Sequence, residues 1–445
     1  MMSKLWDKGI SVDKLIEDFT VGQDRELDLY LAKYDVLGSL AHTQMLNKID
    51  LLEDAELKEV QRELKQIYKE IENGEFVIED GIEDVHSQVE MMLIQRLGEA
   101  GKKIHSGRSR NDQVLVDLKL YIRSELKDLA GQVREFFTLL IKQSEAHKEV
   151  LMPGYTHLQV AMPSSFGLWF GAYAESLADD LHLVQAAYRV ANQNPLGSAA
   201  GYGSSFPLDR SMTTQLLGFD AMNYNVVYAQ MGRGKTEKVV SYALSSVAAT
   251  LSKMAYDVCL YMSQNFGFVS LPDELTTGSS IMPHKKNPDV FELIRSHCNR
   301  IQGIPGQITM MINNLPSGYF RDLQIIKEVF IPAFEELKSC LSIAQYAIEN
   351  IEVKDSILED DRYKYVFSVE EVNKLVLEGV PFRDAYRQVG EKIMNNDFDP
   401  ERTVAHSHEG SIGQLCNEGI VEKFDEIFDA FNFDKVEQAI ANLLR

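Results

Sequence analysis

The sequence predicts a mainly α-helical protein built around a bundle of long helices. Apolar residues recur every three or four positions over long stretches in the middle of the chain, which is the spacing of one face of a helix. No set of consecutive segments alternates apolar and polar residues as half-buried strands would, and no repeat of fixed period occurs. The composition is that of an ordinary globular protein, with 45% hydrophobic and 25% charged residues over 445 positions.

Four apolar series predict the long helices, and they cover residues 122–140, 166–184, 240–261 and 330–348. Helices of about 30 residues are roughly 45 Å long, as in bundles. Pro332 falls within the fourth series and is tolerated only near a helix start, so the first turn of this helix is left open. Further apolar residues lie off the main faces, and we expect association of several copies to bury them.

The chain divides into three predicted regions. Before about residue 105 polar segments alternate with short apolar stretches, and after about residue 355 the helices shorten and acidic residues cluster. We therefore expect an N-terminal helical domain at 1–107, a central long-helix bundle at 108–356 and a small C-terminal helical domain at 357–445.

The charge and the apolar runs exclude several classes of partner. A net charge of −22 repels nucleic acids and anionic membranes, since both need clusters of Lys and Arg. No apolar run approaches the roughly 18 to 20 residues of a membrane span, and no signal region opens the chain, so we expect a cytoplasmic protein. Its four cysteines lie far apart without a Cys-x-x-Cys pair, which predicts neither disulfides nor a metal site.

Four polar or glycine-rich segments interrupt the helical pattern, and such loops are where function concentrates. The first is His105 to Gln113, where Ser109, Arg110 and Asn111 directly precede a long helix. Guanidinium groups, side-chain amides and free helix N–H groups together bind carboxylates. The alternative is a helix cap flanked by solvated arginines.

The next two segments are individually weaker. Residues 153–163 place His157 between two prolines, where it either exchanges protons near neutral pH or has a structural role. Residues 194–205 form a loop of small residues that either lets a ligand approach the backbone or joins two helices.

The fourth segment, residues 276–289, combines glycine, two serines, two prolines and two lysines in an acidic chain. A neutral serine is a poor base, so Ser279 could remove a proton only if nearby amides and a cation such as Lys285 stabilised its alkoxide. The run Gly232 to Thr236 superficially suggests a phosphate loop. It lacks the first glycine and the preceding strand, so we set it aside.

The fourth segment, Gly278-Ser-Ser-Ile-Met-Pro-His-Lys-Lys-Asn-Pro288, resembles the signature of the fumarase/aspartase superfamily, whose members eliminate fumarate from substituted succinates. The segments 105–113, 154–159 and 319–327 are similar to its argininosuccinate lyase branch. This resemblance implies a three-domain fold, a homotetramer with a twenty-helix core, and active sites built from three subunits. It also implies reversible β-elimination of argininosuccinate to arginine and fumarate, in arginine biosynthesis and without a cofactor.

The resemblance further implies individual roles. Ser279 is the expected catalytic base, and Lys285 and Asn287 would stabilise the aci-carboxylate intermediate. His157, oriented by Glu292, would assist proton delivery to the leaving guanidino nitrogen. Other positions match family residues that hold the carboxylates and the amino-acid end of the substrate: Ser109, Arg110, Asn111, Thr156, Tyr319, Gln324 and Lys327.

Some positions depart from the family pattern. The opening motif is altered at residues 5–10, so no N-terminal contact is carried over, and His284 replaces the more usual Gln beside Ser279. Glu83 to His86 resembles a family segment, but we assign it no catalytic role. Two alternatives stay open: a related lyase of the adenylosuccinate or aspartate type, and a non-catalytic crystallin-like scaffold.

Overall fold

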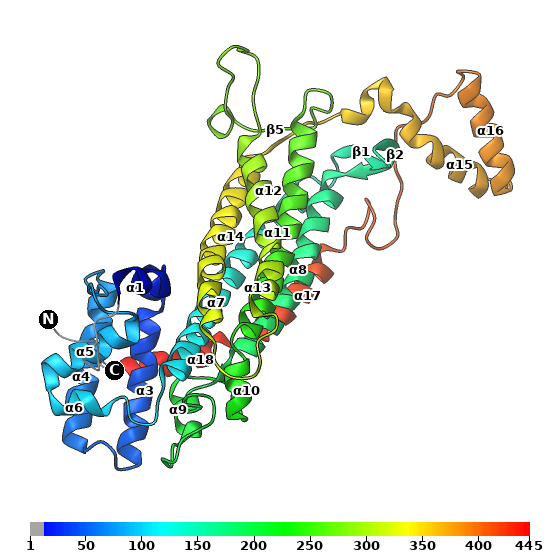
Figure 1. The fold of residues 1–445 in the computed structure, drawn as a ribbon. Helices are drawn as coiled ribbons and strands as arrows, with labels where there is room; N and C mark the ends of the chain where they lie inside the picture. Colours follow the sequence, from blue (N-terminus) through cyan, green and yellow to red (C-terminus); the bar gives the residue numbers. More distant parts are fainter. Residues whose placement is uncertain (1–12) are drawn as a thin grey trace.

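The computed structural model describes residues 13–445, and the altered motif at 5–10 lies outside them. Long helices lie side by side and form an elongated bundle (Figure 1). They are α7 (Arg110–Ala146), α8 (Phe166–Ala191), α11 (Lys235–Met262), α12 (Asp289–Gln302) and α14 (Ile326–Glu349). The predicted mainly α-helical class is confirmed.

The apolar series predicted from the sequence face the core of the bundle. Along α7, the residues Ile122, Leu126, Leu129, Val133, Phe136 and Leu140 are all buried. Helix α14 begins at Ile326, so Pro332 lies inside it, in the second turn. A proline there removes one N–H from the ladder of the helix, but the long apolar face of α14 keeps the helix packed on both sides of it.

The N-terminal region packs at one end of the bundle, where α3 contacts α7 (Figure 1). In α4, Val60, Leu64 and Ile67 are buried at helical spacing while the other face is polar. The elements of this region are α1 (Lys14–Val21), α2 (Asp24–Leu27), η1 (Asp28–Leu31), α3 (Ala32–Lys48), α4 (Asp54–Glu72), α5 (Val85–Leu97) and α6 (Glu99–Lys103).

The opposite end of the bundle carries an antiparallel hairpin of β1 (Leu151–Thr156) and β2 (Gln159–Ser165), which the sequence did not reveal. Both strands contain proline, which is depleted in strands and hides the pattern. Tyr155 anchors the hairpin against Phe266 and Phe268. Nearby lie β5 (Val269–Ser270), η2 (Asp273–Leu275), β6 (Glu352–Val353), η4 (Ile357–Glu359), η5 (Asp361–Phe367), α15 (Ser368–Leu377) and α16 (Phe382–Met394).

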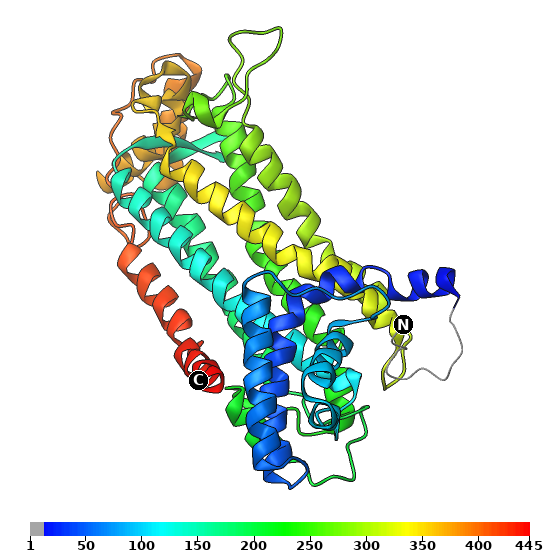
Figure 2. The ribbon, with the colours of Figure 1, turned by 90° about the vertical axis from the view of Figure 1, so that its left-hand side faces the viewer.

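The chain then returns along the bundle. Helix α17 (Asn417–Asp429) packs on α8, and α18 (Phe433–Leu444) reaches α3, so the C-terminus lies beside the N-terminal helices (Figure 2). Shorter elements complete the described chain: β3 (Gln193–Asn194), α9 (Arg210–Leu216), β4 (Ala221–Met222), α10 (Val226–Met231), α13 (Ile304–Ile312) and η3 (Arg321–Ile325). Across residues 13–445, no helix combines the length and the apolar character that a membrane crossing requires.

Candidate active site

A cavity of about 230 Å³ lies where the start of α7 meets η3 and the N-terminal helices. Five residues predicted to bind substrate line it: Arg110, Asn111, Tyr319, Gln324 and Lys327. Segments more than 200 residues apart in sequence therefore converge on one cavity.

Ser109 caps α7 at the edge of this cavity. Its hydroxyl accepts a hydrogen bond from the N–H of Asn111 (3.3 Å), and its own N–H donates to Asp112 (2.8 Å), so serine and aspartate form a capping box. The second oxygen of Asp112 accepts the N–H groups of Gly197 (2.9 Å) and Ala199 (3.0 Å). One buried carboxylate thus joins the first and third predicted loops, and the helix N-terminus faces the cavity.

Arg110 is held by acidic residues that precede α5. Its guanidinium lies 3.2 Å from both Glu83 and Asp84 and donates to the hydroxyl of Ser87 at 2.6 Å. Arg321 also pairs with Glu83. Carboxylates of the same chain therefore pair with both of these arginines.

Lys327 is the most deeply buried of these cations, with 4% of the residue exposed. Its ammonium lies 2.7 Å from Asp24 and 2.6 Å from Asp28. Burial lowers the pKa of Lys327, but the two carboxylates outweigh that effect and keep the pKa above its ordinary value. Burial raises the pKa of Asp24 to about 6 even though Lys327 stabilises its charge.

The two remaining predicted residues come from the segment before α14. Tyr319 is 40% exposed at the cavity. The side-chain amide of Gln324 donates to the carbonyl oxygens of Thr20 (2.9 Å) and Val21 (3.1 Å). Gln324 therefore ties η3 to the end of α1, which helps to place both segments at the cavity.

Arg233 also lines the cavity, and the sequence reasoning missed it. It is buried, its Nε lies 2.7 Å from Glu237, and it donates to the carbonyl of Leu323 at 3.0 Å. The positive φ of Gly234 (78°) turns the chain immediately before α11 and places Arg233 there. The sequence does carry a signal for this position, because an arginine between two glycines directly precedes a long helix.

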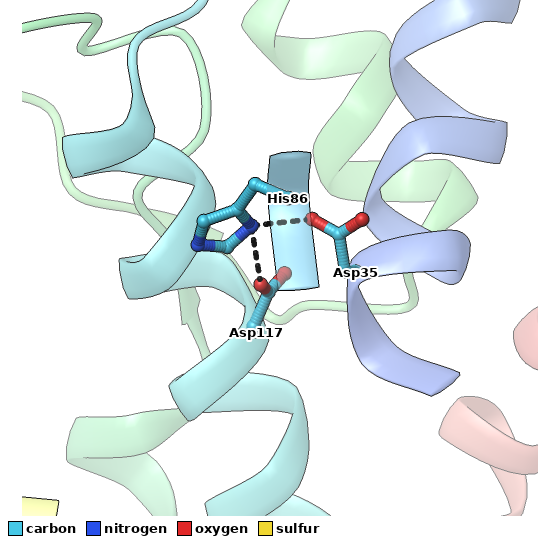
Figure 3. A group of neighbouring side chains, drawn as sticks. All are labelled: Asp35, His86 and Asp117. Carbon is cyan, nitrogen blue, oxygen red and sulfur yellow. Dashed lines mark hydrogen bonds and ion pairs between the residues drawn. The ribbon is translucent and has the colours of Figure 1, made fainter. Parts of the chain in front are cut away.

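Three buried side chains, His86, Asp35 and Asp117, form a triad (Figure 3). The triad adjoins the cavity, because His86 is also one of the residues that line it. The residues come from α5, α3 and α7, and Nδ1 of His86 lies 2.7 Å from Asp35 and 3.4 Å from Asp117. Burial lowers the pKa of His86, but the carboxylates, led by Asp35, raise it to about 10. Burial together with Asp35 raises the pKa of Asp117 well above its usual range.

The atoms of this triad are close enough to hold a metal ion, all within 4.8 Å of one another. A metal there would require a neutral imidazole and ionised carboxylates. An imidazole whose pKa is about 10 is protonated near neutral pH, which is the opposite state for His86, so we interpret the triad as an ion pair between His86 and the two aspartates.

His157 occupies the turn of the hairpin at the far end of the bundle. His157 and Leu158 both have φ of 56°, and the strands pair up to Thr156 and Gln159 on either side. A two-residue turn with positive φ at both positions favours Asn and Gly, and other residues adopt it at a cost of about 1–2 kcal/mol each. Thr156 and His157 are both exposed on this strained turn.

The predicted catalytic loop projects from the same end of the bundle, before α12 (Figure 1). The hydroxyl oxygen of Ser279 accepts the N–H groups of Met282 (3.1 Å) and Ile281 (3.4 Å). The N–H of Asn287 donates to Thr277 at 2.9 Å and closes the base of the loop. Two amides directed at Ser279 are the arrangement that would stabilise an alkoxide.

The remaining predicted groups of this loop are accessible. Lys285 and His284 are exposed, and Glu292 lies exposed in the first turn of α12. Within the described chain, no hydrogen bond or ion pair joins His157 to Glu292 or to the Ser279 loop. The hairpin and the loop lie at one end of the bundle, whereas the segments whose residues line the 230 Å³ cavity, among them the N-terminal helices, meet at the other end (Figure 1).

Comparison with known proteins identifies the class. A family model described as "Lyase" matches residues 8–303. A variant of EDDS lyase solved with bound fumarate has the same fold, with a TM-score of 0.75 and 20% sequence identity, covering 98% of this chain and 94% of that chain. The fold is that of the helical lyases of the fumarase/aspartase superfamily.

Closer relatives narrow the class. Argininosuccinate lyase of Phocaeicola vulgatus is 65% identical over 444 residues, which is 100% of both chains. Argininosuccinate lyase of Bacteroides thetaiotaomicron is 64% identical over 444 residues, again 100% of both chains. The chain belongs to the argininosuccinate lyase family.

Proposed function

We propose that this protein catalyses the reversible β-elimination of argininosuccinate to arginine and fumarate, in arginine biosynthesis. The observation that carries the proposal is full-length identity of 65% to an argininosuccinate lyase. The charges of the residues that line the cavity support the proposal as well, because argininosuccinate carries three carboxylates together with cationic groups. The cavity offers both signs of charge, with Arg110 and Lys327 beside Asp24 and Glu83.

Ser279 is the proposed base. As an alkoxide, it removes a proton from the succinyl carbon next to a carboxylate, which leaves an aci-carboxylate intermediate. The two amides that donate to its oxygen would stabilise the negative charge of the alkoxide. Lys285 and Asn287 would stabilise the negative charge of the aci-carboxylate intermediate. Expulsion of the guanidino nitrogen from the neighbouring carbon then forms the double bond of fumarate.

His157, oriented by Glu292, is the proposed group that assists protonation of the departing guanidino nitrogen. A histidine suits this step because its ordinary pKa lies near neutral pH. The strained turn that holds His157 supports this role, since strain in a backbone is often retained at functional positions. Substrate carboxylates and the amino-acid end would be held by Ser109, Arg110, Asn111, Thr156, Tyr319, Gln324 and Lys327.

We further propose that the active site is shared between subunits of a homotetramer with a twenty-helix core. One chain holds its binding cavity and its Ser279 loop at opposite ends of a long bundle, so a complete site needs residues from other copies. Exposed large apolar side chains on the bundle helices support association: Tyr242, Tyr256, Leu293, Ile343 and Tyr346. The regions 1–107, 108–356 and 357–445 remain our proposed domains, and the cytoplasm our proposed location.

The direct test is production of ultraviolet-absorbing fumarate by the purified protein. We expect fumarate from argininosuccinate without added metal or nucleotide, and little from adenylosuccinate or aspartate at equal concentrations. Absence of fumarate from all three substrates at high enzyme concentration would favour the scaffold alternative. A preference for another substrate would reassign the enzyme within the superfamily.

Ser279→Ala tests the proposed base, and Ser280→Ala is its matched control on the same loop. We expect Ser279→Ala to lower turnover by about three orders of magnitude or more with the fold intact, since it removes only the proton acceptor. Ser280→Ala should retain most of the activity. Near-native turnover of Ser279→Ala would remove this residue from the role.

Mixing two inactive variants tests the shared site. Ser279→Ala and His157→Asn each inactivate every site of their own homotetramer, but a mixed tetramer contains some sites with both native residues. We expect partial activity after subunit exchange, which mass spectrometry of the mixed tetramers can verify. Activity no higher than that of either parent, despite verified exchange, would contradict a shared site.

A further inference from the structure

Arg123 of α7 is a buried cation without a carboxylate partner in the described chain. The residue is 3% exposed, and its two hydrogen bonds go to neutral oxygens, the amide oxygen of Asn192 (3.1 Å) and the carbonyl of Leu217 (2.8 Å). Burial lowers the pKa of Arg123 to about 10, which reflects the cost of holding its charge away from water. Buried charges are normally paired with an opposite charge.

The nearest carboxylate is reached only indirectly. Asn192 donates its side-chain amide to Asp220 at 2.9 Å, and Asp220 is already paired with Lys435 at 2.7 Å. Asp220 therefore already has a cationic partner, and Arg123 is joined to it only through Asn192.

Arg123 lines a cavity of about 410 Å³ that is separate from the candidate active site. Residues of α3, α4, α7, α8 and α18 line it, and the C-terminal helix lies beside the N-terminal helices there (Figure 2). Its volume lies within the range of small-molecule sites, about 300–1,000 Å³. Lys33 and Lys127 also line it, and Glu437, the one carboxylate among its lining residues, is paired with Lys127.

A second polar group in this cavity lacks a partner. Tyr188 is 1% exposed, and its hydroxyl makes no hydrogen bond with any residue between 13 and 445. An unpaired buried hydroxyl costs about 1–3 kcal/mol, and an acceptor atom of a ligand would remove that cost. The hydroxyl of Tyr188 can donate to an acceptor atom of a ligand, and the charge of Arg123, which is held by two neutral oxygens and the ring of Phe219, favours an acceptor that is negatively charged.

The rest of the lining is apolar. Phe433, Ile440 and Leu444 contribute from α18, and Leu37 and Leu120 contribute from α3 and α7. We propose that this cavity is a binding site for a small amphipathic carboxylate, whose head group pairs with Arg123 and Tyr188 and whose apolar or aromatic tail packs against α18.

Calorimetric titration of the full-length protein with 3-phenylpropionate tests the proposal. We expect saturable binding, and much weaker binding of the neutral 3-phenylpropionamide. Phenyl phosphate distinguishes a carboxylate site from a general anion site, because equal or tighter binding of the phosphate would reject the proposed preference. Absence of saturable binding by 3-phenylpropionate up to millimolar concentrations would overturn the proposal.

Two test variants and one control variant locate the binding. Ala441→Trp should fill the cavity from α18 and abolish binding, whereas Asn442→Trp, at the next position of the same helix and outside the lining, should bind as the native protein does. Tyr188→Phe removes only the hydroxyl and should weaken binding about tenfold, because a hydrogen bond to a charged group is lost. Unchanged binding by both Ala441→Trp and Tyr188→Phe would show that the probe binds elsewhere and would overturn the proposal.

Discussion

Replacing Lys327 by Met tests whether the buried ion cluster of the candidate site maintains the fold as well as the cavity. The ammonium group lies between Asp24 and Asp28, and the side chains of Lys327 and Asp28 are only 5% and 3% exposed. Met has similar length but no charge, so the change leaves two carboxylates without their counter-ion. The substitution therefore isolates the charge from the packing.

The structure determines the expected size of the effect. Removal of one partner from a buried ion pair costs about 3–5 kcal/mol, because the remaining charge is uncompensated. Arg233 repels Lys327 and also stabilises the charge of Asp24, so it offsets part of the loss. We therefore expect a decrease of about 3 kcal/mol in the free energy of unfolding, or roughly 3 °C in melting temperature for a chain of this length.

The effect should depend on pH in a defined direction. The pKa of Asp24 is already raised to about 6, so the folded state binds this proton more tightly than the unfolded state does. Loss of Lys327 raises that pKa further, and protonation then removes an uncompensated charge. The destabilisation should be full at pH 8 and smaller at pH 5.

The assay is denaturant unfolding at pH 8 and pH 5, with the protomer concentration fixed because association shifts the apparent stability. Lys423→Met is the matched control, since its side chain is 35% exposed and pairs with Asp179 on the surface. Such pairs contribute about 0–1 kcal/mol. If Lys327→Met were no more destabilising than Lys423→Met, or equally destabilising at both pH values, the reasoning would be refuted.

Two further predictions concern the same end of the bundle. The pKa of His86 is raised to about 10, so its stabilising charge is fully present below its ordinary pKa near 6.5 and is lost as pH rises through 10. His86→Gln should therefore reduce the loss of stability between pH 7 and pH 10, and an unchanged loss would contradict the charged triad. Gly234 has φ of 78°, and an added Cβ would lie 2.6 Å from Ile312, so Gly234→Ala should destabilise the protein by about 1–3 kcal/mol and raise KM by displacing Arg233. Gly306, which has open space at its Cβ, provides the alanine control, and equal stability of the two variants would contradict this prediction.

The long helices were predictable because burial of one face imposes a local rule. Each apolar residue on α7 follows the previous one after three or four positions, whatever the rest of the chain does. The capping of α7 by Ser109 was equally local, and the structure contains this cap at a helix start that adjoins the cavity. In both cases, the prediction of the helix and the prediction of its cap needed only residues of one segment.

The hairpin was missed because its signal is not local. Pro153, Gly154 and Pro163 argue against strands, and the positive φ of His157 and Leu158 contradicts their intrinsic preference. Packing of Tyr155 against Phe266 and Phe268 holds the hairpin in place, and those aromatic residues come from a segment about 110 positions later. Tertiary contacts overrode the local preference.

The sequence by itself determined the helical class, the long bundle and the residue types of the candidate site, because helix periodicity and loop composition depend on near neighbours. Only the tertiary structure decided that Arg233 and His86 join the cavity, and that Lys327 meets Asp24 and Asp28 about 300 positions away. It also decided that Arg123 and Tyr188 line a separate cavity with α18. Charges are paired or left unpaired by distances in space, and those distances follow from the packing of the whole chain.

The overall charge of −22 illustrates the same division. A count of charges predicts long-range repulsion of polyanions, and salt screens such forces beyond about 10 Å. Recognition of a small anion depends on the few groups within that distance. The fold alone places Arg110 and Lys327 around one cavity and Arg123 beside the other.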